Sequence, residues 1–134
     1  MIEPELIELY NRTLYYVFDT EIILKIGAHN PFLDTLLSQY HQEDWVFISA
    51  CNPGSRPLPE EENNLRHEQL KEALGLYSYF EGQGVGEHPT WKPERSLLVI
   101  GISREKAIET GNRFGQNAIV AGRIYLPAEL LILK

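Results

Sequence analysis

The stretch WVFISACNPGSRPLPEEENNLRHEQLKEALG, residues 45–75, decides the expected fold of the whole chain. It begins with an apolar run, residues 45–51, interrupted only by Ser49, which is typical of a strand buried on both faces of its sheet. Four turn-forming residues, 52–55, follow this run. Residues 60–74 then have the spacing of an amphipathic helix, with Leu65, Leu70, Ala73 and Leu74 expected to face inward and Gly75 as its expected C-terminal cap. The stretch therefore predicts a strand, a turn and a helix.

The same kind of patterning continues toward the C-terminus. Residues 77–82, YSYFEG, alternate like a strand at a sheet edge. After a glycine-rich polar segment, Gln83 to Pro93, the run SLLVIGI at 96–102 predicts a second buried strand. Ser103 is the expected cap of a helix that ends at Phe114. A last strand is expected at residues 117–122.

From residue 45 onward, this order is β-α-β-β-α-β, the split βαβ or ferredoxin-like arrangement. The two continuously apolar strands occupy the first and third positions, which are central in that fold, and the more mixed strands flank them. The sequence therefore predicts an α+β fold with a ferredoxin-like core, a mainly antiparallel sheet and helices on one face.

The residues before this core predict an added N-terminal helix and β-hairpin. Pro4 suits the first turn of a helix. Two strand-like runs, 13–18 and 21–27, predict the hairpin. Asn30 is the expected cap of a short helix at 31–40. We expect a single domain, with an extension at 1–44, the core at 45–121 and a C-terminal extension at 122–134.

Composition and charge narrow the class of protein. Of 134 residues, 43% are apolar and 23% charged, as is ordinary for a soluble domain, and the net charge of −7 argues against a nucleic-acid partner. No apolar run approaches the roughly 20 residues that span a bilayer. The acidic start of the chain differs from a secretory signal. With a single cysteine, Cys51, these features predict a cytoplasmic protein that is not bound to a membrane.

The expected topology brings polar side chains to one end of the sheet. Five strand or helix ends are expected to meet there. They are the end of the first core strand, the start of the first helix, the end of the second strand, and the starts of the third and fourth strands. The residues expected in this region are Asn52, Asn63, Arg66, Glu81, Glu94, Ser96, Gln116 and Asn117. Arg66 shares a helix face with Asn63 and is expected beside Glu81 or Glu94, as a bidentate ion pair.

These residues have a structural and a functional interpretation, and the sequence leaves both open. In the structural interpretation, Asn52 serves the turn, Asn63 caps the helix and Arg66 forms an ion pair with a glutamate. In the functional one, the protein is a regulatory module that binds a small molecule or peptide. The ligand-binding residues would be Asn52, Asn63, Arg66, Ser96, Gln116 and Trp91.

Two further hypotheses concern an enzyme and a protein partner. In the enzyme hypothesis, Glu81 or Glu94 transfers a proton and Arg66 binds an anionic substrate. In the interaction hypothesis, the strands at 77–81 and 117–121 are exposed edges that pair with a partner, including a second copy in a homodimer.

The remaining candidate residues predict no metal and no cofactor. The four histidines, His29, His41, His67 and His88, share no metal-ligand spacing with one another or with Cys51. The segment GQGVG, residues 82–86, lacks the helix and lysine of a phosphate-binding loop and is expected to form a flexible hairpin loop.

Five short blocks along the chain resemble a known family. They are Tyr10-x-x-Thr13, FISACNP at 47–53, Asn63-x-x-Arg66 with Leu70, Trp91 with Glu94-x-Ser96, and FGQNAI at 114–119. On these blocks the chain is similar to a family of small bacterial proteins, the domain of unknown function family 3293. That family usually has Glu-Pro-Ser at 94–96 and Thr-Ala at 49–50, where this chain reads Glu-Arg-Ser and Ser-Ala. The resemblance implies no established activity, substrate or cofactor.

Overall fold

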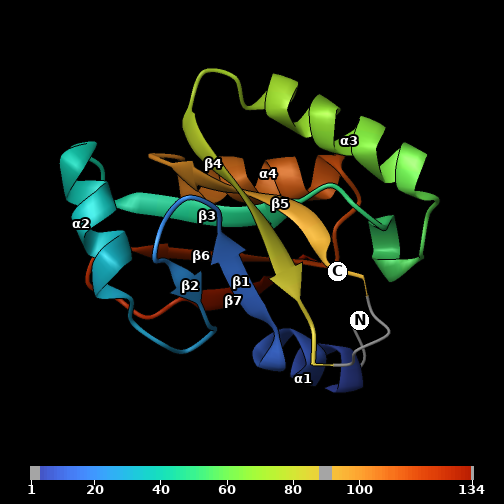
Figure 1. Ribbon diagram of the computed structural model, residues 1–134, viewed down its shortest axis with the longest axis horizontal. Helices are drawn as coiled ribbons and strands as arrows, with labels where there is room; N and C mark the ends of the chain where they lie inside the picture. The colour runs from blue at the N-terminus through green and yellow to red at the C-terminus, as the bar shows by residue number, and fades with distance from the viewer. Residues whose placement is uncertain (1–3, 88–91, 134) are drawn as a thin grey trace.

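The structure is a computed structural model that describes residues 4–87 and 92–133. In these residues the chain forms four α-helices, a short 3-10 turn and a seven-stranded antiparallel sheet that curls (Figure 1). The elements are α1 (Pro4–Arg12), β1 (Leu14–Val17), β2 (Ile23–Leu24), α2 (Pro31–Gln39), β3 (Asp44–Ser49), η1 (Pro53–Ser55), α3 (Glu60–Ala73), β4 (Ser78–Val85), β5 (Glu94–Ile100), α4 (Arg104–Arg113), β6 (Ala118–Arg123) and β7 (Glu129–Ile132). Among the helices described, none is long and apolar enough to cross a membrane.

The sheet has the strand order β2-β1-β4-β5-β3-β6-β7. Strands β3 and β5 pair antiparallel from Trp45 opposite Ile100 to Ser49 opposite Ser96. The prediction that the two continuously apolar strands are adjacent, antiparallel and central is therefore confirmed. Their side chains are buried on both faces of the sheet, which explains why neither strand alternates between apolar and polar residues.

The two faces of the sheet carry two separate apolar clusters. On one face, Leu70 and Leu74 from the α3 segment pack with Val46 and Ile48 of β3. Ala107 brings α4 onto the same face, and both helices run along the upper part of the view (Figure 1). On the other face, apolar side chains of the N-terminal hairpin and α2 pack against the sheet in a second cluster. Helices therefore contribute to both faces of the sheet.

Two helices begin at side-chain caps that the sequence predicts. The Asn30 side chain accepts a hydrogen bond from the Leu33 N–H at 3.0 Å, at the start of α2. The Ser103 hydroxyl accepts one from the Lys106 N–H at 3.1 Å, at the start of α4. Each cap satisfies a backbone donor that has no partner within the helix.

The curled sheet brings its two ends together. A bridge joins Ile26, just after β2, to Ala128, just before β7. Backbone hydrogen bonds on either side of the bridge link Gly27 N–H to Ala128 O at 2.8 Å and Ala128 N–H to Ala28 O at 3.1 Å. This contact joins the N-terminal hairpin to the C-terminal strand around the second apolar cluster.

The glycine-rich segment after Glu81 is a strand, and its prediction as a hairpin loop is wrong. Gly82 pairs with Val17 and Gly84 with Tyr15, so β4 continues to Val85 between β1 and β5. A Cβ atom on Gly82 would lie 2.3 Å from the Tyr16 carbonyl oxygen. Glycine is needed here because β1 approaches closely, and not because the backbone turns.

The prediction that the strand at 117–121 is an exposed edge is also wrong, and the one at 77–81 is not outermost in the sheet, although β1 leaves the outer side of residues 78–80 unpaired. Strand β4 lies between β1 and β5, and β6 lies between β3 and β7. The outermost strands are β2 and β7. The first and last segments of the chain supply β1 and these outer strands. Strand β1 covers residues 82–85 of β4 and β7 covers residues 118–121 of β6, whereas β1 does not reach residues 78–80 of β4.

Helix α3 faces the sheet with a different stripe from the one expected. Leu65 was assigned to the buried face but is 60% exposed, and Ala73 is exposed as well. His67 is fully buried instead, with Leu70 and Leu74. These three positions follow the i, i+3, i+7 spacing of one helix face, whereas Leu65 lies on the opposite side.

Candidate functional site

The turn after β3 is organised by Asn52. Its backbone is left-handed, with φ 48° and ψ 60°, which asparagine tolerates better than most residues. The Asn52 amide nitrogen donates to Glu94 Oε2 at 3.0 Å. Its amide oxygen accepts from the Leu58 N–H at 3.0 Å and from Asn63 Nδ2 at 2.8 Å. Asn52 therefore connects the end of β3 to the start of β5 and to α3.

Asn63 completes this contact without capping its helix. It lies inside the first turns of α3, and its side-chain oxygen accepts from the Asn52 backbone N–H at 2.9 Å. The helix instead begins after Pro59, which provides no side-chain cap. The expected cap at Asn63 is therefore replaced by a pair of hydrogen bonds between Asn63 and Asn52, so both asparagines have a structural task.

Glu94 is a half-buried carboxyl at the start of β5. Burial raises the pKa of Glu94, and hydrogen bonding from the Asn52 amide and the Ser49 hydroxyl offsets part of this effect. In the described part of the chain, Glu94 forms no ion pair with a cation, so neutral groups supply its contacts. A buried carboxylate with only neutral partners is costly, since it loses hydration without gaining a counter-charge.

The charge of Glu94 acts on three nearby protonated groups. They are the phenols of Tyr10 and Tyr15 and the thiol of Cys51. Burial is the main cause that raises the pKa of each group above its ordinary value. The nearby charge of Glu94 adds to it, for Tyr15 after that of Tyr10. Each therefore keeps its proton at neutral pH. The Tyr15 hydroxyl donates to the Tyr10 carbonyl oxygen at 3.0 Å, which links β1 to α1 beside the carboxyl.

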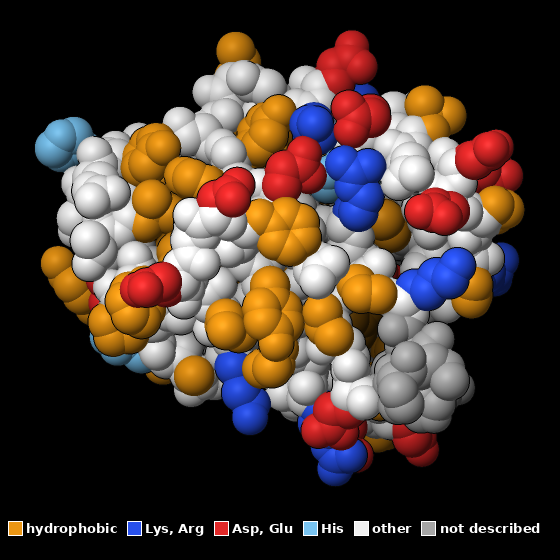
Figure 2. Space-filling model, in the orientation of Figure 1, with side chains coloured by type: hydrophobic (Ala, Val, Ile, Leu, Met, Phe, Trp, Pro, Cys, Tyr) orange, Lys and Arg blue, Asp and Glu red, His pale blue; other side chains and the backbone are white. Residues whose placement is uncertain are grey.

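Glu81, on the neighbouring strand β4, has cationic partners. Its Oε1 lies 2.6 Å from His67 Nε2 and 3.7 Å from Arg95 Nη2, and its Oε2 lies 3.0 Å from Lys71 Nζ. Burial alone would raise the pKa of Glu81, but the hydrogen bonds from His67 and Lys71 outweigh it and lower the pKa. Around β4 and α3, acidic and basic side chains are intermingled on the surface (Figure 2).

His67 is a buried polar residue that the sequence reasoning missed. Its Nε2–H donates to Glu81, and its Nδ1 has no hydrogen-bond partner among the described residues. Burial lowers the pKa of His67, so the imidazole is neutral at pH 7. The available signal was its spacing from Leu70 and Leu74, which places it on the buried stripe of α3. A search for metal-ligand spacing does not test that position.

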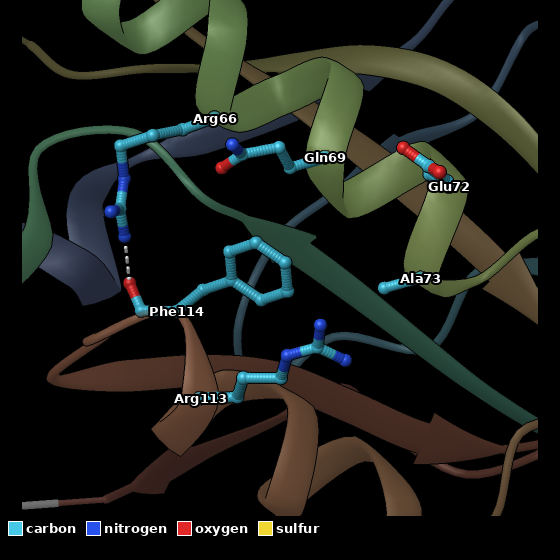
Figure 3. Close-up of a pocket in the computed structure, with 6 residues that line it drawn as sticks. All are labelled: Arg66, Gln69, Glu72, Ala73, Arg113 and Phe114. Carbon is cyan, nitrogen blue, oxygen red and sulfur yellow. Dashed lines mark hydrogen bonds between the residues drawn. The ribbon is translucent and has the colours of Figure 1, made fainter.

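Arg66 forms no ion pair with Glu81 or Glu94, so that prediction is wrong. Its Nε donates to the Ala50 carbonyl oxygen at 2.6 Å, and its Nη2 donates to the Phe114 carbonyl oxygen (Figure 3). Phe114 ends α4, where the helix leaves carbonyl groups unpaired and favours a positive charge. The guanidinium therefore joins α3 to the ends of β3 and α4.

Three other predicted site residues bond to the backbone or to the turn. The Ser96 hydroxyl donates to the Glu94 carbonyl oxygen at 3.1 Å, and Gln116 Nε2 donates to the Cys51 carbonyl oxygen at 3.1 Å. Asn117 Nδ2 donates to the Ser55 hydroxyl at 3.0 Å. The structure thus joins Asn52, Asn63 and Glu94 directly and places the others around them. Trp91 lies outside the described residues.

A cleft of about 610 Å³ opens between α3 and the end of α4 (Figure 3). It is lined by Arg66, Gln69, Glu72, Ala73, Arg113 and Phe114. This cleft involves neither Glu94 nor Asn52. Over residues 4–87 and 92–133, no group of three His, Cys, Asp or Glu side chains is arranged to hold a metal ion.

Comparison with known proteins gives one match. A family model described as "Protein of unknown function (DUF3293)" matches residues 48–119, more than half of the chain. No curated protein and no solved structure matches the chain. The matched range contains Asn52, Asn63, Arg66 and Glu94, whereas Tyr10, on the N-terminal side of the site, precedes it.

Proposed function

The chain belongs to the DUF3293 family of proteins of unknown function, and from its own geometry we propose that it binds a small molecule or peptide at Glu94. The observation that carries this proposal is the half-buried carboxyl of Glu94, which contacts Asn52 and no cation of the described chain. Burial of a carboxylate without a counter-charge is unfavourable, so a carboxyl in such a position is a candidate functional group.

The surroundings of Glu94 support a ligand that offers hydrogen-bond donors or a positive charge. The phenol of Tyr10, the thiol of Cys51 and the Asn52 amide are neutral groups, so a ligand amine would meet the carboxylate without competition from a protein cation. Bonds between an ionised donor and a carboxylate are roughly twice as strong as bonds between neutral groups. We therefore propose a ligand with a protonated amine.

The strand order supports a site at Glu94. Within the sheet, the order β4-β5-β3-β6 is the one expected for a ferredoxin-like βαββαβ core, and we infer that the core belongs to this class as part of a single domain. In this arrangement the start of β5 lies beside the end of β3, which explains how Glu94 reaches Asn52.

Thermal unfolding in the presence of a panel of amines, amino acids and short peptides tests the proposal. A ligand at 100 times its dissociation constant adds roughly 2.7 kcal/mol to the free energy of unfolding. We expect this gain in the unchanged protein and in a Glu129→Gln control, since Glu129 is exposed and paired with Arg104. Glu94→Gln should lose the gain. An amine that stabilises all three proteins equally would place the binding elsewhere.

A second candidate is an acid–base enzyme in which Glu94 transfers the proton. It is favoured by the raised pKa of Glu94 and by the protonated phenol of Tyr10 nearby. Glu81 fits this role less well because two cations, Lys71 and Arg95, and the N–H of the neutral His67 hold its carboxylate in the ionised form. Any amine found above can be incubated with the protein and followed by NMR. Conversion that depends on the ionisation of one carboxyl supports an enzyme, and an unchanged ligand supports binding alone.

A further inference from the structure

We propose that the cleft between α3 and α4 is a second binding site, and that it takes a small molecule with two anionic groups. The cleft has a volume of about 610 Å³, within the range of roughly 300–1,000 Å³ that is usual for small-molecule sites. Its residues are distinct from those around Glu94, so the proposal does not rest on the function proposed above.

The charge of the cleft comes from two arginines. Arg66 and Arg113 both line it, and in the described residues neither forms an ion pair with a carboxylate. Glu72 lines the same cleft but is not within ion-pair distance of either guanidinium. In a protein with a net charge of −7, two arginines without a counter-charge in one cleft favour an anion as the ligand.

Both guanidiniums have donors left for a ligand. Of the five N–H groups of an arginine, Arg66 uses Nε–H and one of the Nη2–H groups for the Ala50 and Phe114 carbonyl oxygens. Within the described part of the chain, the side chain of Arg113 donates no hydrogen bond. The Gln69 amide lies on the same wall of the cleft and adds a neutral donor.

The arrangement around Phe114 determines the shape of the ligand. The Phe114 ring lies between the two arginines, with Arg66 Cζ 6.0 Å and Arg113 Cζ 5.5 Å from its centroid (Figure 3). Because the guanidiniums flank the ring, a single anionic group would meet only one of them. A molecule with an anionic group at each end, such as a dicarboxylate or a diphosphate, would meet both.

Titration calorimetry with adipate, hexanoate and pyrophosphate tests this inference. Adipate and hexanoate have the same chain length but two carboxylates and one. We expect adipate or pyrophosphate to bind at millimolar concentration or better and hexanoate to bind at least 10-fold more weakly, because it meets one guanidinium. Tighter binding of adipate identifies a dicarboxylate site, and tighter binding of pyrophosphate a phosphate site.

Arg113→Gln is the decisive variant, because Arg113 is exposed and bonds to no other described side chain. Loss of one charge-assisted contact should weaken binding of the dianion about 10- to 100-fold. Arg104→Gln is the matched control, since Arg104 lies on the same helix but pairs with Glu129, and it should bind as the unchanged protein does. Glu94→Gln should also bind adipate normally. Equal affinity in Arg113→Gln, equal affinity for hexanoate and adipate, or no binding of either dianion would overturn the proposal.

Discussion

Glu81 and Glu94 lie on neighbouring strands of one sheet, yet their environments shift the pKa values of the two carboxyls in opposite directions. Glu81 is held by His67, Lys71 and Arg95, and its pKa is lowered in spite of burial. Glu94 meets an amide and a hydroxyl, and burial raises its pKa. Two carboxyls whose environments shift their pKa values apart have different tasks. The ion-paired one stabilises the fold, and the other is the candidate functional group.

Among the changes around Glu81 and Glu94, removal of the His67 side chain should cause the largest loss in the free energy of unfolding. His67→Ala leaves a cavity in the core and takes a buried hydrogen bond from Glu81. We expect a loss of about 2–4 kcal/mol in the free energy of unfolding, measured by chemical denaturation. Glu68→Ala, at an exposed position on the same helix, should change stability far less. Equal losses in the two variants would contradict the structural role of His67.

The pH dependence of His67→Ala sharpens this test. The pKa of His67 is lowered from its usual 6.5 by burial, so the folded state favours the neutral imidazole. The corresponding stability is present above pH 6.5 and is lost as the pH falls through the lowered pKa. Stability of the unchanged protein should therefore decrease on acidification below pH 6.5. The variant should lack that part of the decrease.

Glu94→Gln should act in the opposite direction and stabilise the protein at neutral pH. The raised pKa of Glu94 means that the folded state disfavours the charged carboxylate, so the unchanged protein loses stability as the pH rises through that pKa. Glutamine keeps an oxygen for the Asn52 amide and carries no charge. We expect a gain of roughly 0.5–2 kcal/mol at pH 7, as at other sites where function costs stability.

This gain should shrink as the pH falls toward 4.5, where Glu94 is protonated in the unchanged protein. Urea denaturation at several pH values measures both the gain and its pH dependence. A loss of stability in Glu94→Gln at pH 7 would show that the ionised carboxylate of Glu94 stabilises the fold, as that of Glu81 does, and would contradict this prediction.

Lys71→Gln should have the smallest effect. Lys71 contacts Glu81 at 3.0 Å and Glu68 at 3.5 Å, but its side chain is partly exposed. Solvent screens such pairs, so we expect a loss of roughly 0–1 kcal/mol that decreases further at high salt. Denaturation at two ionic strengths checks this. A large, salt-independent loss would show that Lys71, and not His67, is the main partner of Glu81.

Much of the fold follows from local patterns in the sequence. Apolar residues on both faces of β3 and β5 identified the two central strands, and Asn30 identified the start of α2. Topology also predicted that Asn52 and Glu94 meet, because it brings the ends of neighbouring strands together.

The errors concern features that depend on distant parts of the chain. The rotation of α3 about its axis was misassigned, which placed Leu65 inside instead of His67 and gave Arg66 the wrong partners. Only the packed sheet determines that rotation. Gly82 looked like a loop residue because its requirement for glycine comes from β1, which lies far from it in the sequence.

The bridge between Ile26 and Ala128 has a consequence for any attempt to express the family-matched part alone. Both residues lie outside 48–119, as do β1, β2 and β7. A fragment of those residues would also keep only residues 48–49 of β3 and 118–119 of β6. Strand β4 would then lose β1 and β5 would lose most of β3, with two rows of unpaired backbone groups exposed to other chains. We also expect contacts between the first and last thirds of the chain to form late in folding, because a long loop must close first. The ends of this chain thus protect its middle from aggregation.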